Sequence, residues 1–122
     1  MLNVGIFGCG VAGMKHARAY NEIEYISDIL VWDPDDSVKK DLPNYVTFVE
    51  NLYDKISTGQ IDIVSICSPP QYHEPQLDFC LESNVDILIE KPVHIPSSKL
   101  NKIFNKETNR SLSVVHQFKY SE

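Results

Sequence analysis

Three glycines near the start of the chain are the first residues whose type and spacing indicate chemistry. Gly8, Gly10 and Gly13 form a Gly-x-Gly-x-x-Gly pattern, with Val11 and Ala12 between the last two. Such glycines allow a tight turn, close approach of a pyrophosphate to the backbone and close packing of the following helix. A helix N-terminus binds an anion through its exposed N–H groups without needing a lysine. These five residues therefore predict a phosphate-binding loop.

An acidic residue follows the second apolar run. Asp33 lies about 20 residues beyond Gly13, the spacing at which dinucleotide-binding proteins place an acid on the adenosine ribose. A carboxylate there accepts both ribose hydroxyls but repels a 2′-phosphate, as do the nearby Asp35 and Asp36. The two motifs together favour NAD over NADP. The alternatives are structural: a plain strand-to-helix turn at the glycines, and an Asp-Pro turn beginning at Asp33.

Two further polar groups follow the fourth and fifth apolar runs. Ser68-Pro69-Pro70 with His73 comes after one run, and Glu90-Lys91-Pro92 comes after the next. The carboxyl ends of parallel strands face the ligand crevice, so both groups are expected there. The ammonium of Lys91 can stabilise a developing alkoxide and relay a proton, while a nicotinamide carries the hydride. The alternatives are a solvated Lys91 paired with Glu90, and His73 as a helix-start residue.

These motifs, in this order, resemble the Gfo/Idh/MocA family of oxidoreductases over essentially the whole chain. The resemblance rests on the glycine pattern followed by His16, on Asp33, on Ser68-Pro69-Pro70-x-x-His73 and, most specifically, on Glu90-Lys91-Pro92. It implies a Rossmann fold and hydride transfer between NAD or NADP and a hydroxyl-bearing carbon of a sugar, cyclitol or nucleotide sugar.

The resemblance also implies roles for individual residues. Lys91 would reach the nicotinamide ribose and the substrate hydroxyl, which makes it the one catalytic candidate, and Glu90 would orient it. His16 is interpreted as a packing or capping residue rather than a catalytic base. Beyond the phosphate loop and Asp33, the implied cofactor contacts are Ser68, Pro69, His73, Glu90, Lys91 and Gln117.

Apolar runs of strand length alternate with helical segments along the chain. Because several runs are continuously apolar, they suit parallel strands covered on both faces, and right-handed crossovers then predict a doubly wound α/β sheet of order 3-2-1-4-5-6. Asn51 and Ser97 are the expected helix N-caps. The expected strands are residues 2–7, 28–32, 46–48, 61–67, 85–89 and 112–116, and the expected helices are residues 11–20, 36–40, 51–57, 75–83 and 97–106.

Composition limits the remaining possibilities. A length of 122 residues suits one domain, and a net charge of -6 with scattered cations argues against a nucleic-acid partner. The three cysteines lack the paired spacing of zinc ligands, so reduced thiols and no metal site are expected. No apolar run approaches the roughly 20 residues that span a bilayer, and no basic residue precedes the first run. A cytoplasmic protein without membrane contact is the prediction.

Enzymes of the resembling family continue into a second domain that supplies substrate contacts and the oligomer interface. We therefore expect residues 1–122 to be the dinucleotide-binding Rossmann domain, with the C-terminal substrate domain absent and turnover requiring a second domain or partner. A monomer or weak dimer follows. The alternative is a noncatalytic nucleotide-binding or interaction module. A methyltransferase that binds S-adenosylmethionine shares the first two motifs but is disfavoured by Glu90-Lys91-Pro92.

Overall fold

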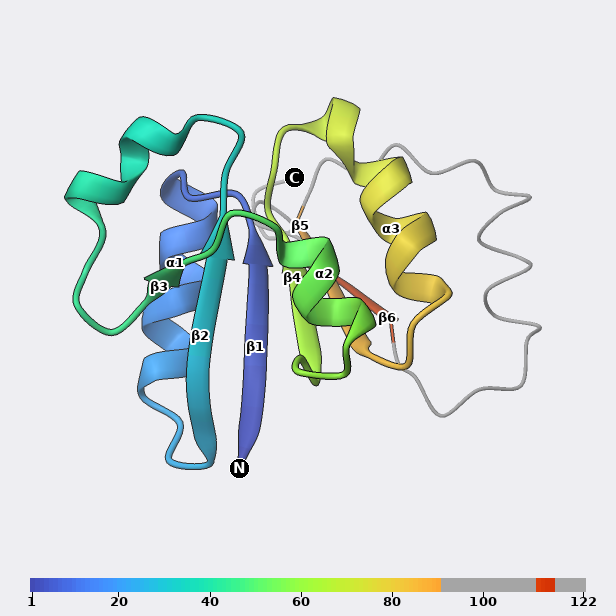
Figure 1. Cartoon of the computed structure of the whole chain (residues 1–122), viewed down its shortest axis with the longest axis horizontal. Coiled ribbons are helices and arrows are strands. Elements are labelled where there is room, and N and C mark those ends of the chain that lie inside the picture. The colour runs from blue at the N-terminus through green and yellow to red at the C-terminus, as the bar shows by residue number, and fades with distance from the viewer. Residues whose placement is uncertain (91–111, 116–122) are drawn as a thin grey trace, which may run out of the picture.

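The computed structural model describes residues 1–90 and 112–115, which form a six-stranded parallel sheet. The strand order is β3-β2-β1-β4-β5-β6, which confirms the predicted doubly wound α/β architecture (Figure 1). The predicted helix at residues 97–106, with Ser97 as its cap, lies outside the described residues. The strands are β1 (Leu2–Phe7), β2 (Ile26–Trp32), β3 (Thr47–Phe48), β4 (Ile63–Ile66), β5 (Asp86–Glu90) and β6 (Leu112–Val115).

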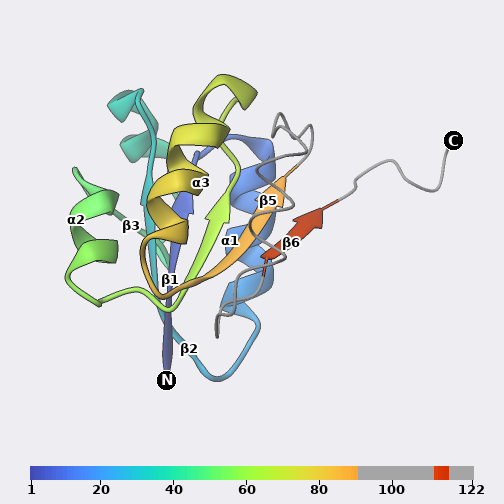
Figure 2. The ribbon, with the colours of Figure 1, turned by 90° about the vertical axis from the view of Figure 1, so that its right-hand side faces the viewer.

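Helices cover both faces of the sheet. Figure 2 views the sheet close to edge-on, with α1 on one side and α2 and α3 on the other. Asn51 caps α2, because its side-chain oxygen accepts a hydrogen bond from the Asp54 backbone N–H at 3.1 Å, as predicted. The described helices are α1 (Val11–Asn21), α2 (Leu52–Ser57) and α3 (His73–Leu81), with two short 3₁₀ helices, η1 (Asp36–Asp41) and η2 (Pro70–Tyr72).

The alternation of side chains along the strands divides the core into two layers. In β1, Phe7 packs with the residues beneath α2 and α3, whereas Ile6 packs with the residues beneath α1. Val64 of β4 lies in the first layer and is fully buried. This burial on both faces explains why the central runs are continuously apolar in the sequence.

One polar group lies within the layer beneath α1. The buried Ser65 hydroxyl of β4 is 2.9 Å from His16 Nδ1 and 2.7 Å from the Tyr20 hydroxyl. Both partners belong to α1, so this network joins the helix to the strand beside β1. The interpretation of His16 as a packing residue is confirmed.

Several element bounds differ from the sequence prediction. The second predicted helix, after Asp33, is a 3₁₀ helix rather than an α-helix, and Pro43 follows two residues after its end. The helix expected from Pro75 begins at His73, because η2 leads directly into it. Among residues 1–90 and 112–115, no helix is long and apolar enough to cross a membrane.

Candidate dinucleotide site at the carboxyl edge of the sheet

The register of the central strands brings the predicted site residues to one edge. Phe7 of β1 pairs with Trp32 of β2 and with Ile66 of β4, and Ile66 pairs with Ile89 of β5. The residues that follow these positions therefore form a row at the carboxyl ends of four adjacent strands. That row contains Gly8, Asp33, Cys67 and Glu90.

Two glycines of the phosphate loop are required by the fold itself. Gly8 has a φ of +105°, and a Cβ built on it would lie 2.8 Å from backbone atoms of Cys67 and Ser68. A Cβ on Gly13 would lie 1.9 Å from the Gly8 carbonyl oxygen. A side chain at either position collides with backbone, so these glycines allow α1 and the loop after β4 to pack against the end of β1.

Gly10 is different, because no packing within the described chain requires a glycine there. Its φ is −79°, and a Cβ built on it would meet no atom within 4 Å. Beside it, the apolar side chain of Val11 is 80% exposed. The space beside Gly10 can therefore take a group that approaches the backbone closely, and Val11 offers that group an apolar contact.

The N-terminus of α1 borders the same open space. In the described part of the chain no side chain caps this helix, and its first turn contains no acidic residue. The backbone N–H groups of the first turn and the positive end of the helix dipole therefore favour an anion. The residues present thus fit the pyrophosphate of a dinucleotide, and the contacts predicted for Val11, Ala12 and Gly13 stay a prediction.

Asp33 lies directly beside the phosphate loop. Its Oδ2 accepts a hydrogen bond from the Cys9 backbone N–H at 2.8 Å, and its Oδ1 accepts one from the Asp35 N–H at 2.9 Å. Each carboxylate oxygen retains a lone pair that a ribose hydroxyl can use. Burial, and secondarily the Asp33 charge, raises the pKa of the Cys9 thiol to about 12, so this thiol stays neutral next to the predicted anion site.

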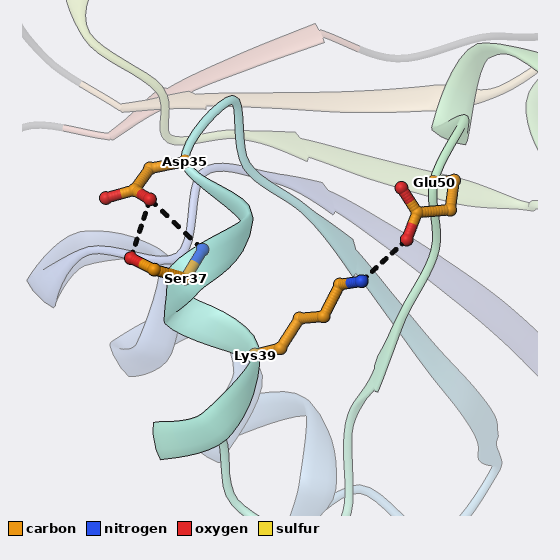
Figure 3. A network of polar contacts seen from close by, with 4 residues as sticks. All are labelled: Asp35, Ser37, Lys39 and Glu50. Atoms are coloured by element: carbon orange, nitrogen blue, oxygen red, sulfur yellow. Dashed lines mark hydrogen bonds and ion pairs between the residues drawn. The ribbon is translucent and has the colours of Figure 1, made fainter.

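The segment after Asp33 is tied by its own polar contacts (Figure 3). Asp35 accepts hydrogen bonds from the Ser37 hydroxyl at 2.6 Å and backbone N–H at 3.1 Å, and these bonds lower the pKa of Asp35. Lys39 points the other way, donates to Glu50 at 2.7 Å and lies 5.1 Å from the centre of the Phe48 ring. Its hydrogen bond to Glu50 raises the pKa of Lys39. The Asp35 carboxylate, two residues after Asp33, is thus held in place.

The loop after β4 carries two predicted cofactor contacts whose side chains are turned inward. Ser68 and His73 are 5% and 1% exposed, and His73 Nε2 donates to the Ser68 carbonyl oxygen at 2.6 Å. The Ser68 hydroxyl donates to Oε1 of Gln76 at 2.5 Å. Pro69 is the exposed residue of the group. Sequence reasoning missed Gln76, although its spacing three residues after His73 indicates a shared helix face.

Of the remaining predicted site residues, only Glu90 lies within the described part of the chain. Glu90 is the last residue of β5, where it pairs with Val115 of β6, and its backbone lies at the row described above. Lys91, Pro92 and Gln117 lie outside the described residues, so their roles remain predictions. Within the described ranges, no group of three or more His, Cys, Asp or Glu is placed to hold a metal ion.

The sheet order, the phosphate loop and the adjacent acid define a dinucleotide-binding Rossmann domain. Comparison with known families agrees: the family described as "Oxidoreductase family, NAD-binding Rossmann fold" matches residues 2–118. The chain belongs to this family, Gfo/Idh/MocA, and is an NAD-binding Rossmann domain within it.

Individual relatives extend well beyond this chain. An inositol 2-dehydrogenase from Corynebacterium glutamicum is 33% identical over 113 residues, which cover 87% of this chain and 33% of that protein. The chain thus spans about a third of the length of this relative.

Two solved structures share the fold at lower sequence identity. A scyllo-inositol dehydrogenase from Lactobacillus casei, with bound NAD(H) and scyllo-inositol, superposes with a TM-score of 0.73 at 19% identity, covering 99% of this chain and 39% of its own. A biliverdin reductase from Synechocystis, in complex with biliverdin and NADP+, gives a TM-score of 0.80 at 21% identity, covering 94% and 38%.

Proposed function

We propose that this domain is the cofactor half of an oxidoreductase that transfers a hydride between NAD and a hydroxyl-bearing carbon of a sugar, cyclitol or nucleotide sugar. The observation that carries the proposal is the open space at Gly10, beside the uncapped N-terminus of α1. The likeness to an inositol 2-dehydrogenase supports the substrate class. Because the chain covers 33% of that relative, turnover is proposed only with a second domain or a partner.

The proposed roles follow the row at the carboxyl edge. The N–H groups of Val11, Ala12 and Gly13 bind the pyrophosphate, and Asp33 binds the adenosine ribose. When bound, NAD supplies the hydride acceptor or donor. On the other side, Lys91 holds or releases the proton of the substrate hydroxyl, Glu90 orients Lys91, and Gln117 contacts the nicotinamide end.

For Ser68 and His73 we propose a role through the backbone. Their side chains are buried and bonded within the chain, so they contribute by holding the backbone that presents the exposed Pro69 to the cofactor. The proposal for the whole protein also includes a cytoplasmic location, a monomer or weak dimer in isolation, and no nucleic-acid partner, in keeping with its net charge of -6.

The preference for NAD over NADP is proposed from the charges around the adenosine ribose. Asp33 and Asp35 are both acidic and both fixed by hydrogen bonds. That segment contains two cations. Lys39 is engaged by Glu50, whereas Lys40 lies close enough to Asp35 for its charge to act on that carboxylate. A 2′-phosphate beside Asp33 and Asp35 would meet two carboxylates that are held in place by hydrogen bonds.

Titration of the chain with NAD and NADP tests this proposal. We expect NAD to bind at least about tenfold more tightly than NADP, since like charges near a phosphate cost on the order of 1 kcal/mol or more. Asp33→Asn should weaken NAD binding and also reduce the ratio of the two affinities. Asp28→Asn removes the same charge at the opposite edge of the sheet and should change neither affinity. Equal affinity for both dinucleotides, or no effect of Asp33→Asn, would refute the assigned role.

A further inference from the structure

Three polar side chains are buried together behind the loop that follows β4. Ser68, His73 and Gln76 are 5%, 1% and 1% exposed. Buried polar groups are costly unless they are hydrogen-bonded, and these are bonded to one another. We call this group the Ser68 clamp.

The prolines explain why side chains hold this loop. Pro69 and Pro70 have no N–H groups, so they cannot donate the backbone bonds that normally fix a turn. His73 Nε2 instead donates to the Ser68 carbonyl oxygen, and because a carbonyl only accepts, the proton is on Nε2. The Ser68 hydroxyl donates to Gln76 Oε1. Two residues of α3, His73 and Gln76, thereby fix Ser68 through its backbone and its side chain.

The clamped loop lies directly against the phosphate loop. A Cβ on Gly8 would be 2.8 Å from the Cys67 carbonyl and from the Ser68 nitrogen, so the two backbones touch. The two neighbours of β1 differ. β4 lies on one side of it, and β2, which is followed by Asp33, lies on the other. A dinucleotide whose pyrophosphate sits at β1 and whose adenosine ribose sits at Asp33 must place its other half over β4.

We propose that the Ser68 clamp makes His73 and Gln76 positioning residues for the nicotinamide half of the dinucleotide. This inference rests on the proposed function, in which Asp33 binds the adenosine half. The clamp holds the backbone of Ser68, which leads into the exposed Pro69, beside the phosphate loop on the β4 side of β1. It leaves the adenosine half untouched, because no clamp residue lies on the β2 side of β1.

The test compares NAD with AMP, which carries only the adenosine side. Ser68→Ala and Gln76→Met break the same hydrogen bond from its two ends. Each should lower the affinity for NAD about tenfold, while the affinity for AMP changes by less than about twofold. The double variant should be no worse than either single variant, as expected for partners in one bond. His73→Gln keeps a donor near the position of Nε2 and should retain more NAD affinity than His73→Leu.

Four outcomes are distinguishable. An NAD-selective loss with non-additive single variants supports the clamp. Equal loss for NAD and AMP means a structural role only, and unchanged affinity for both means no role; either overturns the inference. Urea unfolding of each variant identifies poorly folded proteins, and Ser68→Ala, which removes one atom, is the variant kept for the decision. Failure of the unmodified chain to bind NAD would refute the proposed function instead.

Discussion

At the scale of single residues, the phosphate loop separates glycines required by the fold from a glycine required by a ligand. Gly8 and Gly13 are surrounded by backbone at distances that exclude a Cβ, whereas Gly10 faces open space. The sequence pattern alone predicted all three, but it could not distinguish these reasons, because the distinction depends on which segments fold against the loop.

This difference predicts opposite behaviour for two matched substitutions. Gly10→Ala should leave the free energy of unfolding within about 0.5 kcal/mol and weaken NAD binding by about tenfold or more, because the new methyl group occupies the open space. Gly13→Ala should destabilise the domain by about 2 kcal/mol or more, because its Cβ would lie 1.9 Å from the Gly8 oxygen. Urea unfolding and NAD titration measure both quantities.

The reverse pattern would be hard to reconcile with the structure. If Gly10→Ala unfolds the chain while Gly13→Ala is tolerated, the loop does not have the described conformation. If Gly10→Ala is stable and binds NAD normally, the open space at Gly10 is not part of the site.

At the scale of elements, the continuous apolar runs were sufficient to predict six strands, because strands buried on both faces consist mainly of apolar residues. Right-handed crossovers then predicted the order of the strands. The bounds were less predictable. The segment after Asp33 carries helix-compatible residues, yet it forms the 3₁₀ helix η1. Asp35 caps this helix by accepting a hydrogen bond from the Ser37 backbone N–H. α3 begins at His73 because η2 leads directly into it, and helix propensity alone does not predict such a continuous 3₁₀ turn.

The capping of α2 provides a prediction at this scale. Asn51→Ala should lower the free energy of unfolding by about 1 kcal/mol, because the Asp54 N–H loses its side-chain acceptor. Asn51→Asp retains an acceptor and should lower the free energy of unfolding by less. Asn44→Ala, at an exposed residue outside any helix, serves as the control. NAD affinity should be unchanged in all three. If Asn51→Ala lowers the free energy of unfolding no more than Asn44→Ala does, the cap contributes nothing to the stability of α2.

At the scale of the whole molecule, the site is a consequence of strand register. Gly8, Asp33, Cys67 and Glu90 are far apart in the sequence and meet because the strands preceding them pair in line. The sequence predicted this edge through the general rule for parallel sheets. It did not predict that Ser68 and His73 turn inward, or that Gln76 joins them, because those orientations depend on how α3 packs.

The buried thiols predict how the stability of the whole domain depends on pH. Burial raises the pKa of Cys9 and Cys80 to about 12, and burial also raises the pKa of Tyr20 and Tyr53. The folded chain therefore retains protons that the unfolded chain releases. Stability should be unaffected by these thiols below about pH 8.5 and should fall above it, by about 1.4 kcal/mol per thiol and pH unit, until the folded values are reached.

Urea unfolding between pH 7 and pH 10.5 measures this loss. Cys80→Ala should be less stable at neutral pH because of lost packing, yet its stability should decline less steeply with pH than that of the unmodified chain. An identical slope in both proteins would show that Cys80 does not hold its proton in the folded state.

NMR of the isotope-labelled chain during titration with NAD locates the bound dinucleotide. If NAD binds at the carboxyl edge of the sheet, the backbone amides of Gly8, Gly10, Val11 and Asp33 shift, and so does that of Ser68 on the β4 side. Amides at the opposite edge, at Asn3, Asp28 and Asp62, where the strands begin, should not shift. Shifts confined to that opposite edge, or no shift at saturating NAD, would contradict NAD binding at the carboxyl edge.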